Sequence, residues 1–289
     1  MKLKNTLWIF LILTPLSVLM RVYELLVMID PETGFPRPEF MQADKTLLAL
    51  FFLLFIGFIL LCRMMPRFPP DVPKKSFSLA AVSLVTALVM VSELFRMVIA
   101  DTKGGALFFV QLLLLLATAV YFVLQGFHLL GMVPIARGLT VFPVLWCGVR
   151  LGASFIQYTG IAKISENLLD VGMLCLYLCF WLFHGRLWSG ISSRKTARWV
   201  YGVGLAAALF GVICTVPRWI VSLTGISLHG ASVPGAVDFM MAVYIVVFCF
   251  AAVRNIKSMR ISGEPPAAQT LPAIEPLEDF TGGNGSPQQ

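Results

Sequence analysis

The sequence predicts an all-α polytopic membrane protein, a bundle of about eight transmembrane helices, on three observations. Hydrophobic residues make up 58% of the 289 residues and charged residues only 13%, whereas soluble domains are about 25% charged. The mean hydropathy is +0.85. The apolar residues also fall into runs of about 20, the length that crosses a hydrocarbon core about 30 Å thick. This composition excludes a soluble protein and leaves room for one membrane domain.

Eight apolar runs define the expected helices, and short polar connections separate them. Their approximate ranges are 6–28, 46–62, 77–100, 106–125, 138–158, 167–183, 199–222 and 234–253. We therefore divide the chain into a transmembrane domain of four helical hairpins, residues 1–260, and a tail, residues 261–289. The tail is rich in proline, glycine and acidic residues, which predicts disorder in the cytoplasm.

Basic residues concentrate in alternate connections, and this pattern predicts an N-in/C-in orientation. Lys2 and Lys4 precede the first run, and the connections after the second, sixth and eighth runs are rich in arginine and lysine. Cytoplasmic loops of membrane proteins carry such an excess, so we expect a multi-pass protein of the plasma membrane with both termini cytoplasmic. The alternative, a cleaved signal peptide, is disfavoured because the run is long, lacks a small-residue cleavage site and continues into Arg21 and Glu24.

Four arginines lie within or near the outer halves of the odd-numbered runs. They are Arg21, Arg96, Arg150 and Arg218. An arginine at the centre of a transmembrane helix costs about 2.5–3.5 kcal/mol on insertion scales, so each is expected to need an acidic partner or water. Arg150 is expected near the middle of the membrane, too deep for its side chain to reach the interface.

Four acidic residues are available as partners, and two of them lie on the same helix face as an arginine. Glu24 follows Arg21 by three residues, and Glu93 precedes Arg96 by three, a spacing that brings side chains together on a helix. The other two acids are Asp170 and Asp238. The formal charge of these eight residues is zero, which favours internal pairing.

The charged residues of the C-terminal half repeat with fixed spacing. Arg150 precedes Asp170 by 20 residues. Arg218 precedes Asp238 by the same interval, and in both cases another arginine follows after 16 more residues. The spacing predicts that the fifth and sixth helices and the seventh and eighth helices are repeated hairpins. Arg21 and Asp44 give the first hairpin a looser version of the pattern.

Three function classes remain open. The first is a solute-binding or transport-type protein with an outward-facing polar pocket for a small anionic or zwitterionic ligand. The pocket would be centred on Arg150 and Arg218. This class is considered because secondary transporters place binding sites among helix repeats, with charges near the midplane of the membrane. The second is a non-catalytic membrane scaffold or sensor subunit, in which buried charges pair to fix the arrangement and the tail binds a cytoplasmic protein. The third is an intramembrane enzyme with catalytic groups on different helices. Polar residues expected toward the outer side are Tyr23, Gln111, Gln157, Tyr158, Thr224, Ser227 and His229.

No motif in the sequence indicates a catalytic site, a metal or a cofactor. The three histidines are far apart in the sequence. They do not form the HExxH pattern, whose spacing is typical of a zinc site. The six cysteines lie in or beside apolar runs and form no CxxC, so they are interpreted as packing residues. We expect no nucleic acid as a partner; the expected partners are the lipid bilayer, a small polar solute and a cytoplasmic protein.

Overall fold

The computed structural model describes residues 3–30, 35–63, 75–100, 105–158, 165–190, 194–224 and 235–262. Within these ranges the chain is almost entirely helical, and eight helices are long and apolar enough to cross a membrane. The described residues form no β-strand; Ile29 and Pro36 make one isolated bridge. The predicted all-α class and the predicted number of long apolar helices are therefore confirmed, and both are compatible with a multi-pass membrane protein.

Each expected apolar run corresponds to one long helix. The helices are α1 (Leu3–Tyr23), α2 (Met41–Arg63), α3 (Phe77–Ala100), α4 (Ala106–Leu130), α5 (Val141–Tyr158), α6 (Ser165–Trp188), α7 (Arg194–Leu223) and α8 (Ala236–Ser262). A π-helix, η1 (Glu24–Met28), continues α1, and the short 3-10 helices η2 (Pro38–Phe40) and η3 (Arg137–Thr140) precede α2 and α5. Several helices extend past their apolar runs into polar sequence, and α8 includes the first two residues of the expected tail. The rest of that tail lies outside the described residues.

Helix α7 is the centre of the bundle. It packs against α1, α2, α6 and α8, and every residue from Val200 to Gly211 is buried. Its sequence GVGLAAALFG consists largely of small residues, which allow neighbouring helices to approach closely. A Cβ at Gly211 would lie 2.9 Å from the Cβ of Ala242 and would overlap the hydroxyl of Tyr177, so this close approach requires glycine.

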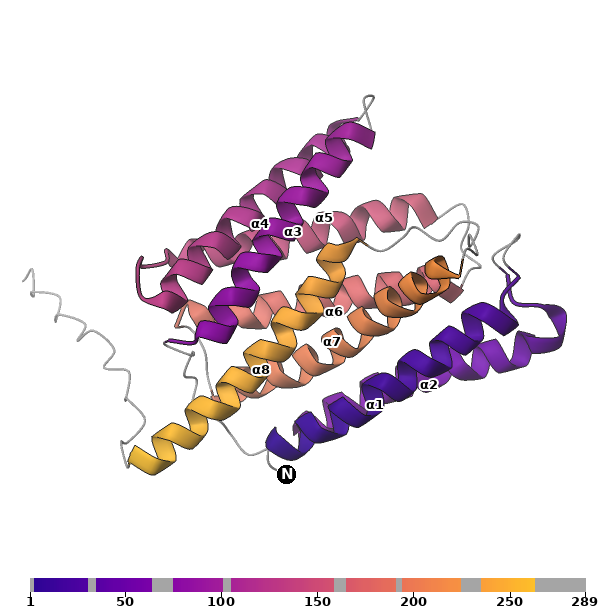
Figure 1. Cartoon of the computed structure of the whole chain (residues 1–289), viewed down its shortest axis with the longest axis horizontal. Helices are drawn as coiled ribbons and strands as arrows, with labels where there is room; N and C mark the ends of the chain where they lie inside the picture. Colours follow the sequence, from indigo (N-terminus) through magenta and orange to yellow (C-terminus); the bar gives the residue numbers. More distant parts are fainter. Residues whose placement is uncertain are drawn as a thin grey trace, which may run out of the picture.

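The arrangement of the other helices determines where the candidate site lies (Figure 1). The α1–α2 hairpin lies along one side of the bundle, the α3–α4 hairpin lies on the opposite side, and α6, α7 and α8 lie between them. Helix α3 packs against α8, α4 against α5, and α5 against α6. Helix α8 therefore lies between α3 and α7, and Asp238 at its start contacts Arg150 of α5 and Tyr177 of α6.

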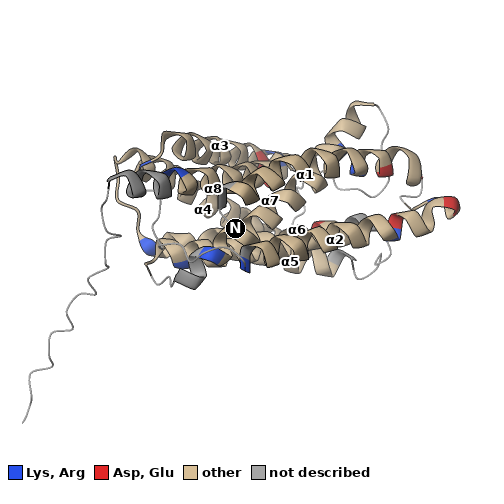
Figure 2. Ribbon diagram, turned by 90° about the horizontal axis from the view of Figure 1, so that it is seen from below, with Lys and Arg blue, Asp and Glu red and all other residues tan. Residues whose placement is uncertain are grey.

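The two ends of the bundle differ in charge (Figure 2). At one end, here called the basic end, several lysine and arginine side chains gather, whereas most acidic residues lie toward the other end, the acidic end. In the sequence, Arg63 ends α2, Lys75 precedes α3, Arg186 is near the end of α6 and Arg198 is near the start of α7. Along the outer faces between the ends, large apolar side chains are exposed, for example Leu88 (69%) and Leu113 (65%). Soluble monomers rarely expose extended apolar surface of this kind, so the exterior is compatible with contact with lipid.

Candidate functional site

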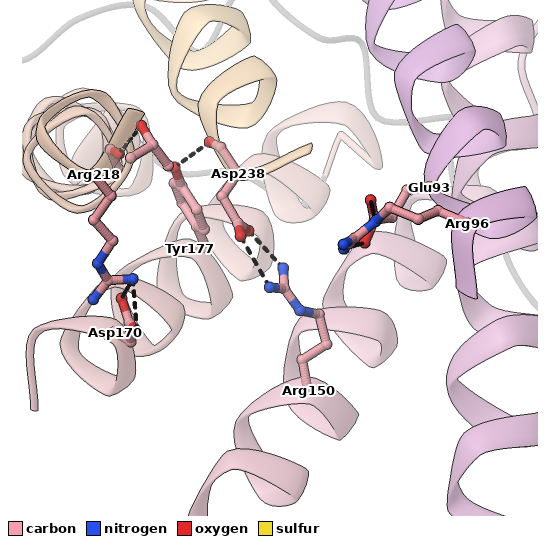
Figure 3. Close-up of polar contacts among 9 residues, drawn as sticks. Glu93, Arg96, Arg150, Asp170, Tyr177, Arg218 and Asp238 are labelled. Atoms are coloured by element: carbon pink, nitrogen blue, oxygen red, sulfur yellow. Dashed lines mark hydrogen bonds and ion pairs between the residues drawn. The ribbon is translucent and has the colours of Figure 1, made fainter. Parts of the chain in front are cut away.

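Two ion pairs join the last two hairpins, and each pair takes its arginine from one hairpin and its aspartate from the other (Figure 3). On α5, Arg150 donates from Nη1 to Oδ1 of Asp238 (2.5 Å) and from Nη2 to Oδ2 (3.0 Å). On α7, Arg218 donates from Nη1 to Asp170, near the start of α6, at 3.0 Å. The repeated spacing in the sequence therefore corresponds to a reciprocal exchange of partners between the α5–α6 and α7–α8 hairpins.

Two aromatic residues hold the Arg150 pair in place. Tyr177 of α6 lies between the two ion pairs (Figure 3) and donates from its hydroxyl to the backbone carbonyl of Asp238 at 2.7 Å. Trp146 lies one turn before Arg150 on α5, and its ring centroid is 4.7 Å from the guanidinium carbon, a cation–π distance. The Asp238 side chain is only 2% exposed and that of Arg150 27%, so the aspartate is buried while one edge of the guanidinium is accessible.

The other two arginines pair with acids on their own chain segments. Arg21 forms a buried ion pair with Glu24, where α1 changes into the π-helix η1. On α3, Arg96 donates from Nε (2.9 Å) and from Nη2 (2.5 Å) to the two carboxylate oxygens of Glu93. The Arg96 side chain is 63% exposed. All eight charged residues singled out in the sequence thus lie in ion pairs, but only part of the set is buried.

Asp44 belongs to the same group of charges, although the sequence pattern placed it in a connection. The apolar run begins at residue 46, whereas α2 begins at Met41, so Asp44 lies in the first turn of the helix. It is 5% exposed. With Asp44 added to the eight residues singled out in the sequence, the group comprises five acids and four arginines rather than a balanced set.

A small pocket opens beside Arg150, between α3, α4, α5 and the start of α8. Its volume is about 70 Å³, and its polar wall is formed by Glu93, Gln111, Arg150 and Asp238. At about 30 Å³ per molecule, this space holds about two waters or a solute group of a few heavy atoms. Arg218 does not line it: Tyr177 stands between that arginine and the Arg150 pair (Figure 3). Within the described residues, the expected pocket centred on both arginines thus corresponds to a pocket that Arg150 lines and Arg218 does not.

A second polar cluster, toward the basic end, had no signal in the sequence. Gln125 of α4 donates from Nε2 to the Tyr244 hydroxyl of α8 at 2.5 Å, and that hydroxyl lies 3.2 Å from Nε2 of His184 on α6. Trp188 Nε1 donates to the same histidine nitrogen at 2.9 Å. Because an indole N–H only donates, Nε2 accepts and Nδ1 carries the proton of the neutral ring. The three helices bring together residues whose sequence spacing is uninformative.

Of the other polar residues expected on the outer side, Gln111 is the one that lines the pocket among those that the structure describes. Tyr23 is 53% exposed, and the Thr224 hydroxyl donates to the Val221 carbonyl at 2.7 Å. The side chains of Gln157 and Tyr158, and the whole of Ser227 and His229, lie outside the described residues. In the described part of the chain no group of three or more His, Cys, Asp or Glu residues is arranged to hold a metal ion.

Comparisons with known proteins add no relative to this description. No protein-family model, no curated protein and no solved structure matches the chain.

Proposed function

We propose that this chain is a multi-pass protein of the plasma membrane that binds or transports a small anionic or zwitterionic solute in the pocket beside Arg150. Both termini are cytoplasmic in this proposal, because the basic end of the bundle would face the cytoplasm under the positive-inside rule. The acidic end, with the pocket, then faces outward. The observation that supports the proposal is the partly accessible guanidinium of Arg150, held by Asp238 and Trp146 at the wall of a polar pocket.

The chemistry of the pocket favours a carboxylate group on the solute. Arg150 uses two of its five N–H groups on Asp238, which leaves donors for a second acceptor, and the planar guanidinium suits the geometry of a carboxylate. Gln111 makes no hydrogen bond within the described ranges and lines the same wall. The Glu93 carboxylate, which accepts from Arg96, also lines the pocket and supplies a negative group for the ammonium of a zwitterionic solute. The pocket volume limits the enclosed part to a few heavy atoms.

Binding and uptake by variants that insert normally test this proposal. Formate, acetate and glycine serve as labelled probes with the purified full-length protein, in detergent for binding and in proteoliposomes for flux. Arg150→Lys loses the bidentate geometry, and Gln111→Leu removes an amide that makes no described bond; both variants should lose at least tenfold in affinity. Arg218→Lys, outside the pocket, is the matched control and should behave like the wild type. Unchanged binding and uptake in Arg150→Lys and Gln111→Leu would refute the proposal.

The pairing of the four arginines singled out in the sequence supports a second candidate, a membrane scaffold or sensor subunit. The Arg150–Asp238 pair connects α5 to α8, and the Arg218–Asp170 pair connects α7 to α6; buried pairs of this kind can specify one arrangement of helices. In this candidate the tail recruits a cytoplasmic protein. Deletion of residues 263–289 should then abolish the co-purification of that protein, whereas a partner that still co-purifies excludes the tail as its docking segment.

A further inference from the structure

Four fully buried side chains each leave one polar atom without a hydrogen-bond partner in the described part of the chain. The atoms are the Tyr121 hydroxyl and Gln125 Oε1 on α4, and Trp181 Nε1 and His184 Nδ1 on α6. All four residues are 0% exposed, and all lie within helices long and apolar enough to cross a membrane. A polar atom in such an interior costs free energy unless it finds a partner.

These side chains belong to one contact cluster around Tyr244 of α8. The Trp181 ring stacks on the Tyr244 ring with centroids 5.4 Å apart, and it meets the His184 ring edge-on at 5.0 Å. The Tyr121 ring lies 6.3 Å from the Trp181 ring. Gln125 is bonded to the Tyr244 hydroxyl through its amide nitrogen, so the unpaired oxygen belongs to the same amide group. The unpaired atoms therefore come from neighbouring side chains rather than from scattered positions.

The unpaired atoms include both donors and acceptors, which indicates the chemistry of a ligand. The indole N–H of Trp181 only donates, and an amide oxygen only accepts. Nδ1 of His184 also donates, because Nε2 of that ring accepts from Trp188. A cation would face two N–H donors, whereas an anion would be buried beside the Gln125 oxygen in a cluster that contains no lysine or arginine. Water both donates and accepts, and buried water typically makes about three hydrogen bonds to otherwise unpaired groups.

We propose that Tyr121, Gln125, Trp181 and His184 form an internal water-binding site between α4 and α6. The two N–H groups on α6 donate to the oxygen of bound water, the amide oxygen on α4 accepts from water, and the tyrosine hydroxyl completes the site. Ordered water thereby joins two helices that belong to different hairpins. None of these four residues lines the Arg150 pocket, and the site does not depend on the function proposed above.

Tyr121→Phe tests the site through the sign of its effect on stability. If the hydroxyl is bonded to water, the variant loses a hydrogen bond, and the melting temperature of the purified protein in detergent should fall by about 2–4 °C. If the hydroxyl is unpaired in a dry interior, the variant removes an unmet polar group, and the melting temperature should rise. Tyr23→Phe is the matched control, because Tyr23 is 53% exposed, and it should melt like the wild type.

Water-edited solid-state NMR of the wild type in lipid bilayers detects the water itself. In protein labelled with 15N-tryptophan, magnetisation should pass from water to the Nε1–H of Trp181, although this residue is fully buried. Contacts to the ring of Tyr244, which stacks on the indole, assign the signal without a variant. This measurement decides alone if Tyr121→Phe does not fold.

Either of two results overturns the proposal. The first is a folded Tyr121→Phe protein that melts at or above the temperature of the wild type. The second is a Trp181 signal that receives no magnetisation from water in the wild type. A lower melting temperature in the variant together with transfer from water to Trp181 supports the site.

Discussion

Removing Arg150 is expected to destabilise the fold mainly through the aspartate that it leaves behind. Asp238 is 2% exposed, and both of its oxygens accept from Arg150. Breaking a buried ion pair by removing one partner costs about 3–5 kcal/mol. Arg150 itself is 27% exposed beside a pocket that admits water, which places Arg150→Met near the lower limit, at about 3 kcal/mol. Asp238→Leu should cost at least as much, because it leaves the guanidinium without its carboxylate.

The double variant Arg150→Met/Asp238→Leu measures how strongly the two residues of the pair are coupled. Apolar replacement of a whole buried pair is often neutral or stabilising, so most of the stability should return. Unfolding of the purified protein, followed by tryptophan fluorescence, gives the three free energies of a double-mutant cycle. Arg96→Met is the control, because that arginine is 63% exposed and an exposed pair contributes about 0–1 kcal/mol. A double variant whose destabilisation equals the sum of the single variants would refute the coupling.

Three further predictions concern packing, the support of α8 and orientation. Gly211→Ala should destabilise the protein by about 1–3 kcal/mol, as overpacking of a core does. The control Gly57→Ala, whose Cβ would meet nothing within 4 Å, should be neutral or slightly stabilising. Thermal unfolding in detergent compares the two variants. Tyr177→Phe loses a hydrogen bond to the α8 backbone and should cost about 1 kcal/mol in the same assay. In a cysteine-free background, an impermeant maleimide added to intact cells should label Glu39→Cys but not Lys75→Cys, and the reverse pattern would contradict the N-in/C-in orientation.

The fold was predictable because its main determinant is local. The thickness of a bilayer sets the length of an apolar run, and a run of that length is helical because no other spanning structure satisfies the backbone within one segment. The pairs Arg21–Glu24 and Glu93–Arg96 were predictable for the same reason, since three residues separate the partners on one helix. The position of Asp44 within a helix was not predictable, because it depends on where α2 begins. Polar residues at the ends of an apolar run make that boundary hard to locate from the sequence.

The structure was needed to identify the partners of Arg150 and Arg218, because the sequence fits two pairing schemes equally well. Each arginine is followed by an aspartate on the next helix at the same interval, so pairing within a hairpin and pairing between hairpins leave the same composition and spacing. The choice between them depends on how α6 and α8 lie around α7, with Tyr177 and Gly211 allowing their close approach. The pocket and the His184 cluster likewise depend on packing between distant segments.

Charge exchange distinguishes the two solutions experimentally. Exchanging Arg150 with Asp238 preserves one opposite-charge contact at that site and leaves the Arg218–Asp170 pair untouched, so the variant Arg150→Asp/Asp238→Arg should fold and be recovered from the membrane. Exchanging Arg150 with Asp170 places two aspartates together at one site and two arginines at the other, and like charges buried in contact are strongly disfavoured. Arg150→Asp/Asp170→Arg should therefore give no monodisperse protein on size-exclusion chromatography. If the second variant folds and the first does not, the arginines pair within their own hairpins, and the exchanged arrangement of α5–α6 and α7–α8 is wrong.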